Sequence, residues 1–147
     1  MADVGRPGAV CGWRADLRHS RDHADVELLA LGHVSPSEVA TWINAADAVI
    51  VPSDYEGFGL ATIEALACNV PVIATPTGIA PDALAGVDGT YCMPFELAAW
   101  RQALDKILED PDPRIAGAAR AEHFSSDAMA ERVVAVYKDV TGGSANA

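Results

Sequence analysis

The stretch that decides the fold runs from residue 49 to residue 75 and is VIVPSDYEGFGLATIEALACNVPVIAT. It begins inside a short apolar segment, Asp47–Val51, of the kind that forms a strand covered on both faces. A loop with two glycines follows, and apolar residues at helical spacing then predict a helix over Leu60–Cys68 whose core face comprises Leu60, Ile63, Leu66 and Ala67. Pro71–Ala74 is a second apolar segment of strand length. Strands that alternate with helices at this spacing predict a parallel α/β sheet.

The same alternation continues on both sides of this stretch. Upstream, Val26–Leu31 predicts a strand that ends at Gly32. Ser35 and Pro36 then suit the N-cap and the first position of a helix that runs to about Ala46. Downstream, we expect a short helix, a short strand and three further helices over residues 80–85, 90–93, 96–109, 113–123 and 126–140. The expected fold class is therefore α/β, a Rossmann-like parallel sheet flanked by helices, with additional C-terminal helices.

The expected α/β domain occupies residues 27–141. Residues 1–26 are dense in Arg, Asp and His and show little apolar periodicity, so they are poorly defined and offer at most one strand. Residues 142–147 are expected to form a frayed tail.

Charge restricts the classes of ligand. The chain of 147 residues has a formal net charge of -11. This excess argues against non-specific binding to nucleic acid or to an anionic membrane, since both require a basic surface. No Lys or Arg lies between Arg21 and Arg101. A phosphate bound by that interval must therefore depend on backbone amides, on a helix dipole, or on cations from another chain or domain or from the N-terminal arginines Arg6, Arg14, Arg18 and Arg21.

The cysteines and the hydropathy pattern indicate the cellular setting. Cys11, Cys68 and Cys92 are scattered, without CxxC spacing, and we expect Cys68 and Cys92 to be small core residues in a reducing compartment. No apolar run approaches the roughly 20 residues of a membrane span. We therefore expect a cytoplasmic protein, attached peripherally to the inner face of the membrane only through another domain or partner.

Two carboxylates mark the candidate site. Glu56 lies in the glycine loop, and Glu64 lies about one turn inside the helix that follows. Glycines let backbone amides approach a ligand, and a helix N-terminus favours an anion. Carboxylates suit hydroxyl groups instead, and a vicinal diol can donate two hydrogen bonds to one of them. Together they predict a nucleotide-sugar site, although an exposed helical Glu64 and a solvated turn Glu56 are ordinary alternatives.

Residues Val51–Thr75 resemble the signature of the family-4 retaining glycosyltransferases, which have the GT-B fold and an E-x7-E motif, here Glu56 to Glu64. The flanks agree, because Gly32-His33-Val34 and Phe124-Ser125 also resemble the corresponding parts of the family. The resemblance covers about residues 28–140. It implies that residues 27–141 are the C-terminal, nucleotide-sugar-binding half of a GT-B architecture.

The resemblance also implies a role for each matching residue. Glu64 would bind the ribose hydroxyls, and Glu56 would be the catalytic carboxylate near the reacting carbon of the sugar. Backbone around the diphosphate would come from Gly57, Phe58, Gly59 and Leu60. Val34 and Ser35 would lie against the base. A hexose would pass from a UDP-, GDP- or ADP-linked donor to a glycan, lipid or small-molecule acceptor with retained configuration, and neither a metal nor another cofactor is implied.

The chain departs from the family pattern in several places. Asn69 stands where the family usually has Gly, a change that a helix C-cap tolerates because Asn adopts the left-handed conformation. After the following strand the family usually has a Gly-Gly pair and then an acidic residue. This chain has the altered segment Gly78–Asp82 there, and Asp82 is only a loose match to the acidic residue. The family's Arg and Lys phosphate clamp, and its N-terminal acceptor domain, have no counterpart in these 147 residues. We therefore expect a truncated member that is catalytically incomplete alone and needs an acceptor domain or partner chain.

Two other functions remain open. A non-catalytic nucleotide-binding module that acts through a partner chain would use the same site. A nucleotide-sugar epimerase would share the fold class, but the spacing of Glu56 and Glu64 favours the glycosyltransferase.

Overall fold

The computed structural model describes residues 31–142. The expected N-terminal segment 1–26, the strand expected at residues 26–31 except for Leu31, and residues 143–147 lie outside this range. Gly142, expected to begin the frayed tail, is still helical.

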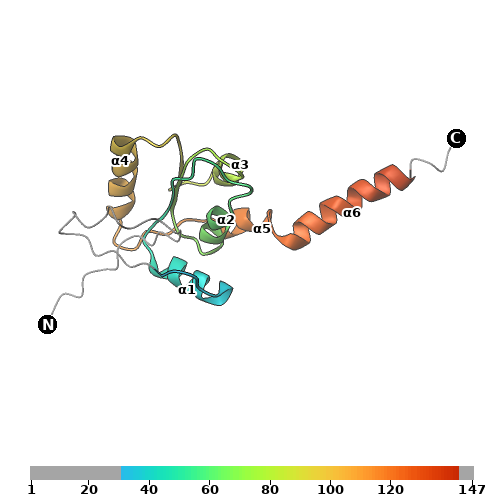
Figure 1. Ribbon diagram of the computed structural model, residues 1–147, viewed down its shortest axis with the longest axis horizontal. Coiled ribbons are helices and arrows are strands. Elements are labelled where there is room, and N and C mark those ends of the chain that lie inside the picture. Colours follow the sequence, from blue (N-terminus) through green and yellow to red (C-terminus); the bar gives the residue numbers. More distant parts are fainter. Residues whose placement is uncertain (1–30, 143–147) are drawn as a thin grey trace.

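Between residues 31 and 142 the chain alternates helices and strands as predicted. The elements are α1 (Pro36–Ala45), β1 (Val49–Val51), α2 (Leu60–Ala67), β2 (Val72–Ala74), α3 (Ala80–Leu84), β3 (Tyr91–Cys92), α4 (Leu97–Leu108), α5 (Ala118–Glu122) and α6 (Ser126–Gly142). The strands pair in parallel in the order β1-β2-β3 (Figure 1). The predicted parallel α/β sheet is therefore confirmed.

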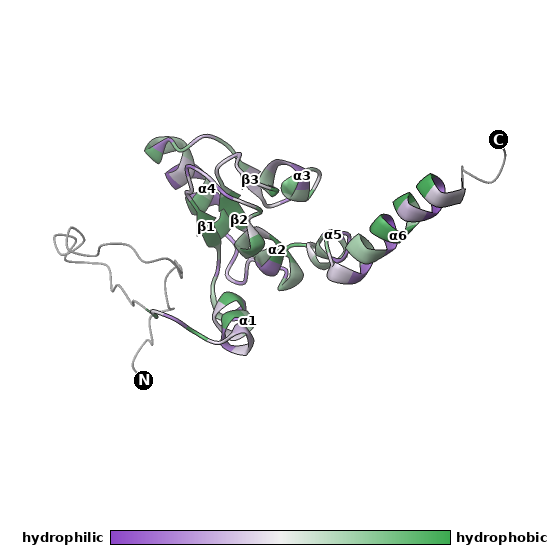
Figure 2. Ribbon diagram, turned by 45° about the vertical axis from the view of Figure 1, so that its right-hand side comes forward, coloured by the Kyte–Doolittle hydropathy of each residue, from purple (hydrophilic) through white to green (hydrophobic). Residues whose placement is uncertain are grey.

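The sheet carries a separate apolar cluster on each face, because successive strand residues point to opposite sides. Ile73 lies with Trp100 and other residues of α4 on one face. Its neighbours Val72 and Ala74 belong to the larger cluster on the other face, which includes residues of α1, α2, α3 and α5. Figure 2 shows the strands as a strongly hydrophobic centre between these helices. The sheet is thus the middle layer of an α/β/α sandwich.

The buried face of α2 differs from the predicted one. Thr62, Ala65 and Leu66 are buried, whereas Leu60 is 63% exposed and Ala67 is also exposed. The prediction placed Leu60 and Ala67 on the core face from spacing alone. The buried face of α2 is instead determined by its neighbours, because the helix packs against both the sheet and α5. The first turn of α2, with Leu60, is left open at the end of the sheet.

The helix expected over residues 113–123 is shorter in the structure and begins only at Ala118. Its first part is engaged by Asn69, whose carbonyl accepts from the Ile115 N–H at 2.9 Å and whose Oδ1 accepts from the Gly117 N–H at 3.0 Å. A β-carbon on Gly117 would lie 2.7 Å from the Leu66 carbonyl oxygen. The segment before α5 therefore packs tightly against the end of α2 and takes its hydrogen bonds from there.

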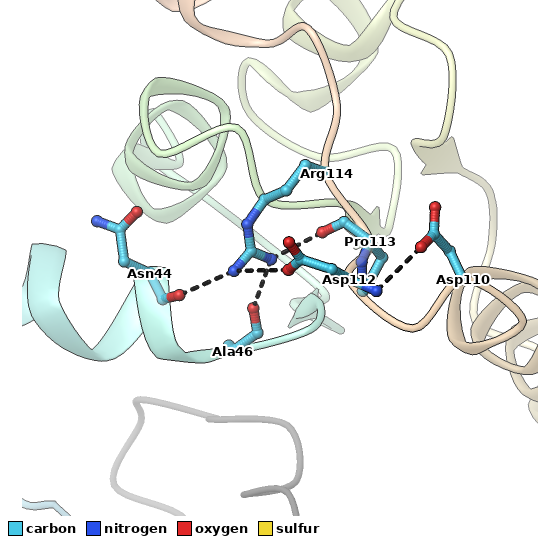
Figure 3. Close-up of polar contacts among 6 residues, drawn as sticks. All are labelled: Asn44, Ala46, Asp110, Asp112, Pro113 and Arg114. Atoms are coloured by element: carbon cyan, nitrogen blue, oxygen red, sulfur yellow. Dashed lines mark hydrogen bonds and ion pairs between the residues drawn. The ribbon is translucent and has the colours of Figure 1, made fainter.

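Arg114, just upstream of α5, ties this segment to the C-terminal end of α1 (Figure 3). Its guanidinium donates to the carbonyls of Asn44 at 3.1 Å and Ala46 at 3.3 Å. It also lies 3.6 Å from a carboxylate oxygen of Asp112. A cation beside the free carbonyls at a helix C-terminus is electrostatically favourable. Arg114 therefore caps α1 from a distant part of the chain.

The last helix, α6, has a different environment from the others. Figure 1 shows it extending away from the sheet and its flanking helices. None of its residues is buried, and Val136, Tyr137 and Val140 are each more than 60% exposed. The sheet and the helices before α6 thus contain the apolar core.

The cysteines divide between two environments. Cys68 packs partly against the larger apolar cluster, as expected, but Cys92 is exposed, so its prediction as a core residue is wrong. Cys92 lies on β3, which is at the edge of the described sheet and is covered less completely. None of the helices between residues 31 and 142 has the length and apolar character that a membrane span requires.

Candidate functional site

A cleft of about 850 Å³ lies where β1 ends and α2 begins. Six of the residues predicted for the site line it: Val34, Glu56, Phe58, Gly59, Leu60 and Glu64. Ser35 and Gly57, also predicted, do not line it. Ser35 instead directs its hydroxyl and its N–H to the Glu38 carboxylate at the start of α1. The cleft therefore gathers most of the predicted site from three parts of the chain.

The backbone at the start of α2 presents free donors to this cleft. Gly59 has φ +97°, a left-handed conformation that favours glycine, and it forms the N-cap of α2. The Thr62 N–H returns to the Gly59 carbonyl at 3.1 Å, while no acceptor within residues 31–142 takes the N–H of Leu60 or Ala61. The first turn contains no acidic residue. Such a helix start is suited to an anion, including a phosphate.

Glu64 lies one turn further along α2 and faces the same cleft. Its side chain is exposed, and its carboxylate accepts no hydrogen bond within the described part of the chain. Burial raises the pKa of the neighbouring Cys68 thiol, an effect that the Asn44 amide opposes and the charge of Glu64 reinforces. The carboxylate of Glu64 is thus available to hydroxyl groups that enter the cleft.

Glu56 is half-buried in the glycine loop. The Ser53 hydroxyl donates to its Oε1 at 2.7 Å. No other hydrogen bond to this carboxylate is formed among residues 31–142. One oxygen of Glu56 is therefore fixed by the loop, and the other remains available to a ligand.

The loop after β2 supports the glycine loop from behind and does not line the cleft. The Ile79 N–H donates to the Phe58 carbonyl at 2.7 Å, and the Thr75 hydroxyl donates to the Ser53 carbonyl at 2.5 Å. Residues of the turn at 32–35 and of the loop starting at Pro52 line the cleft, whereas the loop starting at Thr75 braces the Pro52 loop.

Sequence reasoning missed part of the lining. Trp42, at a helical spacing that is typical of a packing residue, is half-buried and lines the cleft with Val39 and Ile50. Tyr55 also lines it and is 84% exposed. The signal for Tyr55 was its place beside Glu56 in a loop. Trp42 gave no such signal, because its helical spacing is equally typical of a core residue.

The described cleft contains acidic side chains and no basic ones. Asp54, Glu56 and Glu64 line it, and none of the lysines and arginines in residues 31–142 does. Arg101, the first cation after the motif, is exposed on α4 near Asp105. The described residues also contain no group of three metal-ligating side chains. Within this range, a phosphate in the cleft can therefore meet neutral donors, such as the backbone amides, but no cation.

The fold has a close counterpart among solved structures. Sucrose-phosphate synthase from Thermosynechococcus elongatus matches 79% of this chain with a TM-score of 0.68 and 30% sequence identity. The match covers 31% of that protein. The described domain therefore corresponds to one half of a GT-B architecture.

Comparison with protein families and with curated proteins identifies the family. Residues 10–139 match the family described as "Glycosyl transferases group 1". The D-inositol 3-phosphate glycosyltransferases of Mycobacterium tuberculosis and Mycobacterium bovis are 36% identical to this chain over 115 residues. That match covers 74% of this chain but only 24% of those relatives. On this evidence, the chain belongs to the family of group 1 glycosyl transferases.

Proposed function

We propose that the cleft binds a nucleotide sugar, and that the chain is the donor-binding domain of a retaining glycosyltransferase. The donor would be a hexose linked to UDP, GDP or ADP, and the acceptor a glycan, a lipid or a small molecule. One observation carries the proposal. Glu56 and Glu64 line one cleft, together with the start of a helix whose first amides are free.

The geometry suggests how the parts of the donor are distributed. The diphosphate meets the amides at the start of α2, which supply hydrogen bonds and a favourable dipole. Glu64 accepts the two ribose hydroxyls, because its carboxylate has both oxygens available. Val34, which also lines the cleft, packs against the base. Glu56 accepts a hydroxyl of the hexose.

Glu56 has a further role in the proposed reaction. As the bond between the anomeric carbon and the diphosphate breaks, positive charge develops on the sugar ring, and a nearby carboxylate stabilises it. The acceptor hydroxyl attacks the same face that the diphosphate leaves, so the configuration is retained. The proton of that hydroxyl passes to the departing diphosphate, which becomes a nucleoside diphosphate.

The leaving diphosphate needs more charge than the described cleft provides. Preorganised donors and cations at such a position are commonly worth about 3–4 kcal/mol each in the transition state. No Lys or Arg of residues 31–142 lines the cleft. We therefore propose that the described domain binds the donor, and that transfer of the sugar at a useful rate needs cations from outside residues 31–142, with an acceptor domain or partner chain among their sources.

The same observation favours a second candidate, a non-catalytic nucleotide-binding module that acts through a partner. The two functions differ in their products. A partner that supplies cations and an acceptor should restore transfer in the first case, whereas in the second it would bind without any glycoside being formed.

The proposal is tested by titrating the protein with UDP-, GDP- and ADP-linked hexoses and following the backbone amide resonances. We expect one nucleotide class to shift the amides of Leu60, Ala61 and Glu64 while those of α6 stay unchanged. Binding that shifts only residues outside the cleft, or no binding by any member of the panel, would contradict the proposed function.

A further inference from the structure

We propose that Ser53 is a positioning residue that orients Glu56 toward the hexose of a bound nucleotide sugar. This inference rests on the proposed function and adds a residue to it. Ser53 is half-buried, and its hydroxyl lies 2.7 Å from Oε1 of Glu56, three residues further along the loop. A glutamate in a loop otherwise samples many side-chain rotamers, and a hydrogen bond to one oxygen selects among them.

Ser53 can orient Glu56 only if its own backbone is fixed, and the end of β2 fixes it. The Thr75 hydroxyl donates to the Ser53 carbonyl at 2.5 Å, and the Thr77 hydroxyl lies 3.4 Å from the same oxygen. Thr75 is itself buried, and its N–H donates to the Val51 carbonyl at 3.1 Å. The Ser53 main chain is thus tied to a buried residue at the carboxyl end of β2.

Gly78 restricts Glu56 from a second direction. A β-carbon at Gly78 would lie 2.8 Å from Cβ of Glu56 and 2.4 Å from the Phe58 carbonyl oxygen. The next residue, Ile79, donates its N–H to that same Phe58 oxygen at 2.7 Å. The backbone after β2 therefore packs directly against the stem of Glu56, and the Ser53 hydroxyl orients its tip.

The arrangement leaves one carboxylate oxygen of Glu56 free in a cleft that it lines. A carboxylate used for binding or catalysis must be held close to its productive geometry by neighbouring hydrogen bonds. Loss of the Ser53 hydroxyl keeps the charge of Glu56 but releases its orientation. The effect should appear only for ligands that reach Glu56, namely those that carry the sugar.

The test compares each nucleotide sugar with its own free nucleotide. The probe is the UDP-, GDP- or ADP-linked hexose that binds the wild-type protein most tightly, and the reference is the matching nucleoside diphosphate. We expect Ser53→Ala to weaken binding of the nucleotide sugar about fivefold, as for one lost hydrogen bond, and to leave binding of the nucleoside diphosphate unchanged. Ser53→Thr, which keeps the hydroxyl, should restore most of the affinity.

A double-mutant cycle with Glu56→Ala, which removes the acceptor of the Ser53 hydrogen bond, separates orientation from a general structural effect. In the Glu56→Ala background, Ser53→Ala should no longer affect binding of the nucleotide sugar. An equal loss for both ligands, a loss that persists in the Glu56→Ala background, or no loss at all would each overturn the positioning role while leaving the nucleotide site in place. Failure of the wild-type protein to bind any of the nucleotides would overturn the proposed function, and the role of Ser53 with it.

Discussion

Polar side chains gather at both ends of the β1–β2 pair, but the two groups are bonded very differently. At the amino ends, Asn69 and Arg114 direct their side chains to main-chain groups of other segments. At the carboxyl ends, Glu64 accepts no hydrogen bond within the described residues, and Glu56 uses one oxygen only. The first group is committed to holding helices together. The second keeps its hydrogen-bonding capacity for something that enters the cleft.

This contrast explains how one small domain separates stability from binding. Burying a polar group without a partner is costly, so groups at the packed end of the sheet are satisfied internally. The open end can leave carboxylates unpaired, because water hydrates them until a ligand replaces it. Substitutions at the amino ends should therefore change the free energy of unfolding without changing the dissociation constant for a nucleotide. Substitutions of Glu56 or Glu64 at the carboxyl ends should do the reverse.

Asn69→Ala should give the largest loss of stability. Asn69 has φ +57°, and its Oδ1 accepts from the N–H groups of Gly117 and Ala118, which begin α5. Alanine loses both hydrogen bonds and is strained in the left-handed region, for a total of about 3 kcal/mol in the free energy of unfolding. Urea unfolding measures this loss.

Asn69→Gly is the matched control, because glycine accepts the left-handed backbone and loses only the hydrogen bonds. It should cost roughly half as much as Asn69→Ala. If the Asn69→Ala and Asn69→Gly proteins have the same free energy of unfolding, the left-handed backbone conformation contributes nothing to the loss of stability. If either change alters nucleotide affinity, residues at the amino ends of the strands contribute to binding as well as to stability, contrary to our proposal.

Arg114→Ala should have a smaller effect on stability. It removes the two hydrogen bonds to the C-terminal carbonyls of α1, but the side chain is 38% exposed, so solvent compensates in part. We expect a loss of about 1–2 kcal/mol in the free energy of unfolding. Arg114→Lys should recover only part of it, because a single ammonium cannot reproduce the fork of a guanidinium. Full recovery by lysine would show that charge alone is sufficient.

Glu38 tests whether a carboxylate that already accepts hydrogen bonds within the protein contributes to stability and not to nucleotide binding. It lies in the first turn of α1, next in sequence to the cleft-lining Val39, yet the Ser35 hydroxyl and the Ser35 N–H both donate to it and lower the pKa of its carboxyl. A carboxyl whose pKa is lower in the folded state stabilises the protein above its ordinary pKa. That contribution to stability is lost as the pH falls through the lowered pKa of the folded state.

The wild-type protein should therefore lose more stability than Glu38→Gln between neutral pH and pH values below the lowered pKa. Thermal unfolding midpoints across this range make the comparison, and the difference should be small because Glu38 is exposed. Parallel curves for the two proteins would mean that Ser35 and Glu38 do not interact in solution. Glu38→Gln should not change nucleotide affinity.

The local parts of the fold were the parts that sequence could predict. Ser35 and Pro36 determine the start of α1 by their own chemistry, and the strand around Ile50 is apolar over its whole length. The segment before α5 could not be predicted in the same way. Helical periodicity continues through Ile115, but the Asn69 carbonyl and the crowded Gly117 hold that segment in another conformation. Those contacts join residues almost fifty positions apart.

The site was predictable to a similar extent. Glu56 and Glu64 were chosen from chemistry and spacing, and the structure brings both to one cleft, while their roles stay predictions. Trp42 was missed because a tryptophan at helical spacing is equally compatible with a core. The contact between the Ser53 hydroxyl and Glu56 depends on a loop conformation that no periodicity encodes.

The most direct test of the account is calorimetric titration of a nucleoside diphosphate into Glu64→Ala and Glu131→Ala. Glu131 is an exposed glutamate on α6, also helical, and it does not line the cleft. Glu64→Ala should weaken binding by about 1–3 kcal/mol, as for lost hydrogen bonds to a charged group, with the free energy of unfolding unchanged within about 0.5 kcal/mol. Glu131→Ala should match the wild-type protein in both measurements. Equal affinity in the two variants, with both proteins folded, would contradict the claim that Glu64 holds the nucleotide.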